Sequence, residues 1–267
     1  MCTAISLYTK QRYHYLARTM DFAFEFNGIP TIVPRHYHYQ FDLDSDMRLE
    51  YGFVGTNLKV GRYRFGDGIN EKGLAISNHY FTGEASYSTH KRYGYFNLAP
   101  EEFIVWVLGF NKSISELKQK VKKINIMNEK NTTLNIVPPL HFMVTDETGH
   151  TVAIEPHNGL LIVKDNYVHT LTNVRHQLRC SHNEDENLMN CFKVLESVSI
   201  PQGAVIDANK IHYTQYQLVM ESKERSYYIK PYFSNQIFKI KLTEDLLSKN
   251  ELTFLPINHE LKITSIQ

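Results

Sequence analysis

The chain has 267 residues, and its 29 lysines and arginines against 28 aspartates and glutamates give a formal net charge of +1. Such a balance argues against nucleic acid or an anionic membrane as a partner. Hydrophobic residues make up 42% of the sequence, which is enough for a substantial core, and we expect one domain over residues 2–267.

The first ~95 residues are predicted to be mostly β-structure, since apolar runs there alternate with turn residues. Residues 2–7 and 13–17 flank a polar turn and predict a hairpin at the amino terminus. His36 and His38 alternate with tyrosines within residues 35–41, which predicts a further strand. Three more strands are expected at residues 31–34, 51–55 and 73–77.

Two helices are predicted next. Pro100 opens an almost wholly apolar segment over residues 103–108, which we expect to be buried between layers. Ser113 and Glu116 fit a capping box, with Ser113 as the N-cap. An apolar stripe at helical spacing follows and consists of Ile114, Leu117, Val121 and Ile124.

Strands return after residue 139. Residues 140–145 and 151–155 predict a hairpin, and strands at 160–164 and 167–171 follow it. A third helix over 186–197 places Leu188, Cys191, Phe192 and Leu195 on one face. The chain closes with predicted strands at 216–220, 227–232 and 237–242. We therefore predict an α+β fold with two mainly antiparallel sheets and helices outside them.

The sequence contains no motif for a cofactor or a metal. Its 13 histidines form no HExxH pair, and no glycine-rich phosphate loop occurs, so we expect chemistry without a cofactor and without a metal. Cys2, Cys180 and Cys191 have no disulfide or metal-knuckle spacing. With no signal peptide and no apolar run of ~18 residues, we expect a soluble protein in the reducing cytoplasm.

Cys2 directly follows Met1. Removal of Met1 would give Cys2 a free α-amine, whose ordinary pKa of roughly 7.7–8 makes it a base near neutral pH. A nucleophilic thiol and its general base would then share one residue, as they do in enzymes with an amino-terminal threonine. The alternative interpretation is an ordinary buried cysteine, because free cysteine is among the most buried residue types.

The whole chain resembles the choloylglycine hydrolase family, the bile salt hydrolases and penicillin V acylases among N-terminal-nucleophile hydrolases. The motifs that carry this resemblance are Met1-Cys2-Thr3-Ala4, Ala17-Arg18-Thr19-Met20-Asp21-Phe22, Pro34-Arg35, Asp67-Gly68-Ile69-Asn70-Glu71-Lys72-Gly73-Leu74, Pro138-Pro139-Leu140-His141-Phe142, Ile154-Glu155-Pro156, Thr172-Asn173 and Ser199-Ile200-Pro201-Gln202-Gly203. The resemblance implies a four-layer αββα fold and hydrolysis of a C–N amide bond outside peptides.

The resemblance also assigns roles to residues. Cys2 matches the nucleophile, Arg18 and Asp21 match the pair that flanks it, and Asn173 matches the side-chain donor of the oxyanion hole. Tyr80 falls at the second oxyanion-hole position and would donate its backbone N–H. Bile salt hydrolases usually carry asparagine there, whereas penicillin V acylases can carry tyrosine. We therefore predict a penicillin V acylase-like enzyme that acts on phenoxyacetyl or related acyl amides.

Two alternatives stay open: a conjugated bile salt hydrolase that releases glycine or taurine, and a catalytically impaired homologue that only binds acyl amides. Loops near the nucleophile are expected to form the acyl pocket, although the same residues are equally expected in a strand-rich core. The candidate pocket residues, with Tyr80, are Phe22, Phe24, Phe26, Phe81, Tyr87, Leu140 and Phe142.

The sequence departs from the family after Asn173, where typical members have a much longer segment that ends in a catalytic arginine. Arg175 and Arg179 are the candidates for that arginine, and the alternative is that both lie on the surface. The missing segment also helps to build the family's tetramer. We therefore expect a monomer or a dimer no less than the tetramer, with a small-molecule N-acyl amide as the partner.

Overall fold

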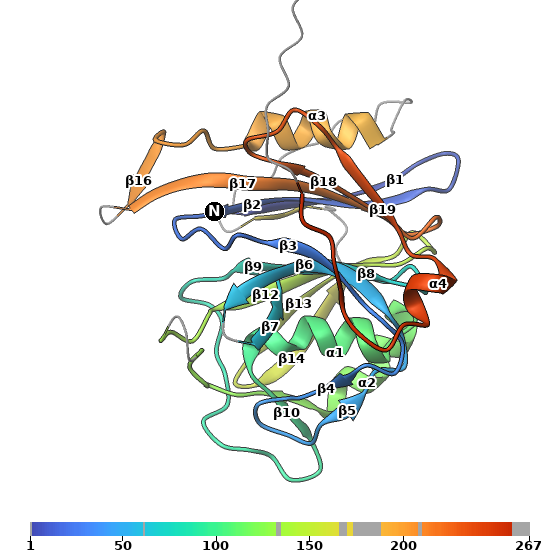
Figure 1. The fold of residues 1–267 in the computed structure, drawn as a ribbon. Coiled ribbons are helices and arrows are strands. Elements are labelled where there is room, and N and C mark those ends of the chain that lie inside the picture. The colour runs from blue at the N-terminus through green and yellow to red at the C-terminus, as the bar shows by residue number, and fades with distance from the viewer. Residues whose placement is uncertain are drawn as a thin grey trace, which may run out of the picture.

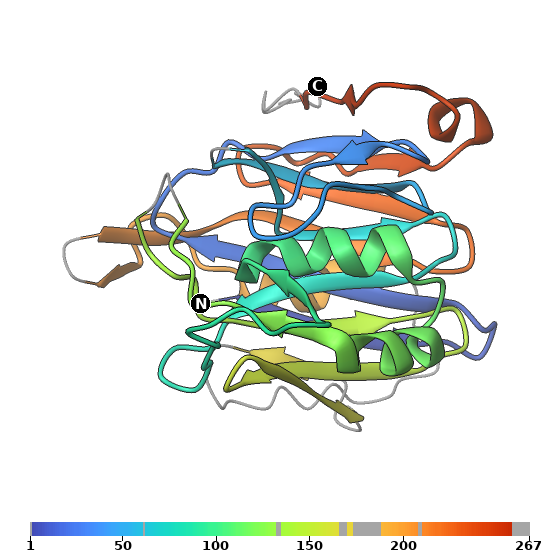
Figure 2. The same cartoon turned by 90° about the horizontal axis from the view of Figure 1, so that it is seen from below.

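The computed structural model describes residues 2–60, 62–131, 135–165, 170–172, 188–207 and 210–257. Figure 1 shows four layers: helix α3 (Leu188–Val198), a first sheet, a second sheet, and helices α1 (Phe103–Phe110) and α2 (Ile114–Lys120). Figure 2 shows α1 and α2 covering the outer face of the second sheet. The fold is therefore the predicted αββα sandwich.

Seven strands of the described chain form the first sheet, in the order β15-β1-β2-β17-β18-β19 with β16 joined to β17. All of these pairings are antiparallel. The strands are β1 (Thr3–Tyr8), β2 (His14–Phe22), β15 (Thr170–Thr172), β16 (Val205–Asp207), β17 (Lys210–Glu221), β18 (Ser226–Pro231) and β19 (Phe238–Lys241). The hairpin predicted at the amino terminus is β1–β2, and it pairs with β17 from the other end of the chain.

Nine strands of the described chain form the second sheet, in the order β14-β13-β12-β9-β8-β6-β3-β20 with β7 joined to β6, and their pairings are also antiparallel. The strands are β3 (Ile29–Val33), β6 (Phe53–Val60), β7 (Arg62–Phe65), β8 (Asp67–Asn70), β9 (Ala75–Tyr80), β12 (Leu140–Thr145), β13 (Thr151–His157), β14 (Leu160–Asp165) and β20 (Thr253–Phe254). The hairpin predicted from residue 140 onward is β12–β13.

The remaining elements are short. β4 and β5 form a two-stranded antiparallel ladder, and β10 and β11 form a parallel one. Their bounds, with those of the short helices, are β4 (His38–Tyr39), β5 (Met47–Arg48), β10 (Phe96–Leu98), β11 (Ile124–Ile126), the 3₁₀ helices η1 (Pro100–Glu102) and η2 (Val121–Lys123), and α4 (Glu244–Leu247).

The prediction of a strand over residues 35–41 is wrong. Only His38–Tyr39 is extended and paired, because His36 adopts a left-handed backbone with φ of 60°. The Tyr37 N–H closes the turn by donating to Pro34 O at 3.4 Å. Alternating residue types were therefore a poor guide at this point of the chain.

The predicted capping box at α2 is half formed. Ser113 Oγ accepts from the Glu116 N–H at 3.3 Å, as predicted, but the Glu116 carboxylate accepts from the N–H of Lys112, one residue before the N-cap. The helix also ends at Lys120, so the last two members of the apolar stripe, Val121 and Ile124, lie in η2 and β11. Both are nevertheless buried.

Three apolar layers separate the four layers of structure. All eight residues of α1 are buried, as predicted for a helix between layers. Cys191 and Phe192 of α3 pack onto the outer face of the first sheet, so Cys191 is a core thiol. Cys2 belongs to the third apolar layer, between the two sheets.

No helix among the described residues is long and apolar enough to cross a membrane.

Candidate active site

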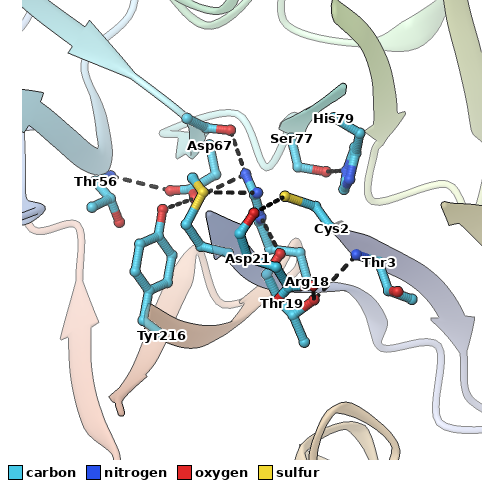
Figure 3. Close-up of polar contacts among 12 residues, drawn as sticks. Cys2, Thr3, Arg18, Thr19, Asp21, Thr56, Asp67, Ser77, His79 and Tyr216 are labelled. Atoms are coloured by element: carbon cyan, nitrogen blue, oxygen red, sulfur yellow. Dashed lines mark hydrogen bonds and ion pairs between the residues drawn. The ribbon is translucent and has the colours of Figure 1, made fainter. Parts of the chain in front are cut away.

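Cys2 lies just before β1, with its side chain between the two sheets and only 3% exposed. Its thiol donates to the main-chain carbonyl of Asp21 at 3.5 Å (Figure 3). The following N–H, of Thr3, donates to Thr19 Oγ1 at 3.1 Å and holds the backbone in place. Burial raises the pKa of the Cys2 thiol, although the charge of Arg18 opposes this effect. A base must therefore withdraw the proton before the sulfur can act as a nucleophile.

Arg18 and Asp21 both lie on β2, but their side chains occupy opposite faces of the sheet because a spacing of three residues reverses the face. Arg18 shares the inner face with Cys2. The Asp21 carboxylate lies on the outer face, where it accepts from Thr19 Oγ1 at 2.9 Å and from Thr214 Oγ1 at 2.6 Å. Among the described residues, the hydrogen bond between Cys2 and Asp21 is therefore made by the main-chain carbonyl of Asp21.

The Arg18 guanidinium is completely buried between the sheets and is held by three oxygen acceptors. Its Nη1 donates to Gly66 O at 2.7 Å and lies 3.4 Å from Asp67 Oδ2, and its Nε donates to Thr19 O at 3.2 Å (Figure 3). The carboxylate partner of Arg18 is thus Asp67 of the second sheet. Among the described residues, no ion pair joins Arg18 to Asp21.

Asp67 is also completely buried, and donors surround both of its carboxylate oxygens. Oδ2 accepts from Tyr216 OH at 2.7 Å in addition to its ion pair with Arg18. Oδ1 accepts from Tyr227 OH at 2.7 Å and from the Thr56 N–H at 3.1 Å. Burial of this ion pair is compensated by those hydrogen bonds, so the network fixes the Arg18 cation next to Cys2.

A cavity opens beside Cys2. Most of its wall is apolar, but several polar side chains interrupt it. The lining residues besides Cys2 are Met20, Phe22, Phe26, Leu58, Phe65, Pro138 and Leu140, with the polar or amphipathic Arg64, Asn78, His79, Tyr80, Glu101 and Asn131.

Four of the predicted pocket residues lie together in this wall. The Phe22 ring is 4.9 Å from the Phe26 ring and 5.2 Å from the Tyr80 ring, measured between centroids. Leu140 lies opposite Tyr80 in the β9–β12 ladder. These side chains form an apolar, aromatic surface next to the thiol, which suits an apolar acyl group.

The other predicted pocket residues do not line the cavity. Phe24 is 48% exposed, and the Phe81 ring stacks on His141 with its centroid 4.4 Å away. The Tyr87 hydroxyl supports the wall from behind, since it donates to Pro138 O at 2.8 Å. Phe142 is buried beneath α1. Phe142 lies two residues after Leu140 on β12, and its side chain belongs to the hydrophobic core and not to the cavity wall.

The backbone N–H of Tyr80 points toward the β8 side of β9. Phe81 N–H donates to Pro139 O, and in an antiparallel ladder this alternation turns the N–H of Tyr80 away from β12. On the β8 side, pairing ends where Asn78 N–H donates to Gly66 O at 3.0 Å. In the described ladders the Tyr80 N–H is therefore not used by a neighbouring strand, as an oxyanion donor requires.

His79 is a cavity residue that the sequence did not single out. Its ring is buried beside Cys2, and its Nε2 lies 2.9 Å from Ser77 Oγ (Figure 3). Burial and the neighbouring charge of Arg18 hold the pKa of His79 well below its ordinary value. The imidazole is consequently neutral and adds no second positive charge next to the thiol.

Asn173, Arg175 and Arg179 lie outside the described residues. The described chain brings Thr172 opposite Thr3 in the β15–β1 ladder, so the residue before Asn173 is beside the backbone that follows Cys2. Within the described ranges, no three histidine, cysteine, aspartate or glutamate side chains gather closely enough to hold a metal ion.

The profile for "Linear amide C-N hydrolases, choloylglycine hydrolase family" matches residues 2–177 and 174–255. The chain belongs to the choloylglycine hydrolase family. The match breaks at residues 174–177, at the place where the sequence predicts a shortened segment.

Two relatives of this choloylglycine hydrolase family member carry the name of a bile salt enzyme. The bile salt hydrolase/transferase of Clostridium perfringens is 25% identical over 334 aligned positions that cover all of both chains. Its namesake from Lactiplantibacillus plantarum is 35% identical over 175 residues, which are 65% of this chain and 52% of that one.

Solved structures share the fold. The C2A mutant of the conjugated bile acid hydrolase from Clostridium perfringens superposes with a TM-score of 0.90 at 23% identity, with both chains fully covered. Penicillin V acylase from Agrobacterium tumefaciens gives a TM-score of 0.77 at 19% identity, covering 96% of this chain and 91% of that one. This family member therefore has the N-terminal-nucleophile hydrolase fold.

Several residues of the site were not identified from the sequence. Asp67 and Met20 lie inside motifs that were recognised, but no role was assigned to either. Thr214 and Tyr216 lie on β17, and nothing near them in the sequence indicates that β17 pairs with β2. That pairing is what places the Thr214 hydroxyl against Asp21.

Proposed function

We propose that this choloylglycine hydrolase family member hydrolyses the C–N bond of small N-acyl amides through Cys2, in the manner of a penicillin V acylase. The observation that carries the proposal is the position of the Cys2 thiol, which lies between an aromatic cavity and the buried Arg18 cation. The cavity can hold an apolar acyl group, while the cation favours the thiolate over the thiol.

The proposed reaction begins once Met1 has been removed. The freed α-amine of Cys2 takes the thiol proton as the sulfur bonds to the amide carbonyl carbon. The tetrahedral intermediate then collapses, the C–N bond breaks, and the protonated α-amine gives its proton to the departing nitrogen. The remaining thioester is attacked by water, which loses a proton to the α-amine and releases the carboxylic acid with regeneration of Cys2.

Two donors are proposed for the oxyanion that forms in both steps. One is the backbone N–H of Tyr80, whose direction away from β12 supports this role. The other is the side-chain amide of Asn173, assigned by the family motif. Loss of one such donor typically lowers kcat by about 10²–10³-fold. Arg18 is proposed to stabilise the thiolate, and Asp21 to hold the thiol through its carbonyl.

A bile salt hydrolase is the second candidate, and the names of the relatives favour it. The solved structures from Clostridium perfringens include a C2A mutant and an R18L variant of a conjugated bile acid hydrolase. Positions 2 and 18 of this chain carry the same cysteine and arginine, which supports a common catalytic scheme. Tyr80 favours the penicillin V acylase alternative, on the family pattern.

Mass spectrometry before and after exposure to penicillin V and to glycocholate tests the proposal. We expect a protein without Met1 that releases 6-aminopenicillanic acid; release of glycine instead would support the bile salt alternative. A Cys2→Ser variant should lose nearly all turnover, and full activity in that variant would refute the mechanism. Retained Met1 with no turnover of either amide would identify the protein as a non-catalytic binder.

A further inference from the structure

Three polar side chains, Arg64, Glu101 and Asn131, interrupt the apolar wall of the cavity that contains Cys2. They come from β7, from η1 and from the loop after β11. Glu101 lines the cavity together with Tyr80. Burial raises the pKa of the Tyr80 hydroxyl to about 12, and the neighbouring Cys2 and Glu101 contribute to the same shift. The polar group thus belongs to the acyl cavity itself.

Arg64 is 5% exposed, and several hydrogen bonds hold its side chain in place. Its Nη2 donates to the Asp42 carboxylate. Its Nη1 donates to Tyr39 OH at 2.8 Å and to Glu102 Oε1 at 3.3 Å. These contacts hold the two terminal nitrogens, Nη1 and Nη2, while Nε is the nitrogen that approaches Glu101.

One donor and one acceptor of this group are buried without a hydrogen-bond partner in the described part of the chain. Arg64 Nε lies 3.8 Å from Glu101 Oε1, which is too long for a hydrogen bond, and makes no other. Asn131 Nδ2 donates to Glu101 Oε1 at 2.6 Å, which leaves Glu101 Oε2 unpaired. Glu101 is 7% exposed. Unpaired buried polar atoms are rare and costly in folded proteins.

We infer that the acyl group of the substrate carries a hydroxyl group, which binds between Arg64 Nε and Glu101 Oε2. A hydroxyl both donates and accepts, so it can satisfy both atoms at once. An acyl carboxylate would face Asp42, Glu101 and Glu102 with only Arg64 to offset them, and an ammonium would lie against Arg64. This inference rests on the proposed function, in which the cavity binds the acyl part of an N-acyl amide.

Binding to a Cys2→Ala variant tests the inference without requiring turnover. The probes are the 6-aminopenicillanic acid amides of phenoxyacetic acid and of its 2-, 3- and 4-hydroxyphenoxy analogues, measured by calorimetry. We expect at least one hydroxylated amide to bind about 10- to 100-fold more tightly than the unsubstituted amide, since its hydroxyl meets two charged groups. Equal or weaker binding of all three hydroxylated amides overturns the inference.

A Glu101→Gln substitution on the same background should reduce this preference, because the amide offers a neutral group in place of the carboxylate. Glu129→Gln is the matched control, since Glu129 is exposed and outside the cavity wall, and it should keep the preference. An undiminished preference in Glu101→Gln would also contradict the inference. Turnover of the amides by the unmodified enzyme is scored separately: hydrolysis without hydroxyl preference refutes only the inference, and binding without hydrolysis refutes only the proposed function.

Discussion

Replacing Asp67 by asparagine tests whether a buried ion pair positions Arg18 next to Cys2. The substitution keeps the shape of the side chain and removes its charge. Both partners are completely inaccessible to solvent. Among the described residues, Asp67 is the only carboxylate within ion-pair distance of Arg18, so the guanidinium would remain buried without a counter-charge.

The expected cost follows from the contacts. In the native protein both oxygens of Asp67 accept hydrogen bonds. Whichever way the new amide is oriented, its NH₂ therefore faces groups that donate to Asp67: Arg18 and Tyr216 on one side, or Thr56 and Tyr227 on the other. Breaking a buried ion pair by removing one partner costs about 3–5 kcal/mol. We expect Asp67→Asn to lower the free energy of unfolding by that amount.

Urea unfolding followed by the fluorescence of Trp106, the single tryptophan, measures this loss. Tyr227→Phe removes the hydrogen bonds of this hydroxyl with Asp67 Oδ1 and with Thr56 Oγ1 but leaves the ion pair, and should cost about 1.5–3 kcal/mol. Asp165→Asn, at an exposed ion pair with Lys118, should leave the unfolding midpoint unchanged. The reasoning is refuted if Asp67→Asn costs less than Tyr227→Phe, or if its turnover of acyl amides equals that of the unmodified protein.

Two further predictions concern stability. Burial lowers the pKa of His141 to about 4, whereas in the unfolded chain this histidine takes up a proton near pH 6.5. Because the unfolded chain binds the proton more readily, the free energy of unfolding falls as the pH drops from 6.5 to 4. From pH 7 to pH 5 we expect the unmodified protein to lose about 2 kcal/mol more than His141→Phe, which keeps the stack on Phe81; equal losses in urea unfolding would contradict this. Gly73 has a φ of 78° and a Cβ there would lie 2.5 Å from Ser222 O, whereas Gly83 has a similar φ and open space. Gly73→Ala should therefore lower the thermal midpoint clearly more than Gly83→Ala, and equal shifts would show that the close approach is unimportant.

Much of the fold could be predicted from the sequence because its signals are local. The β1–β2 hairpin, the wholly apolar α1 and the β12–β13 hairpin each follow from a periodicity or a turn within a few residues. The strand predicted around His36 fails for the same reason, since a single left-handed residue ends it. Cys2 was identifiable as a nucleophile candidate from its position and its family motif alone.

The partners of the candidate site residues could not be predicted, because they lie on strands that the chain brings together only in the folded state. A spacing of three residues on one strand already implies that Arg18 and Asp21 face opposite sides. It does not reveal that Asp67 of the second sheet receives Arg18, or that Thr214 of β17 receives Asp21. Residue patterns encode which face of a strand is buried, whereas the packing of the two sheets decides which side chains meet there. The amino-acid sequence by itself determined the family and the nucleophile candidate, and only the tertiary structure decided what surrounds that cysteine.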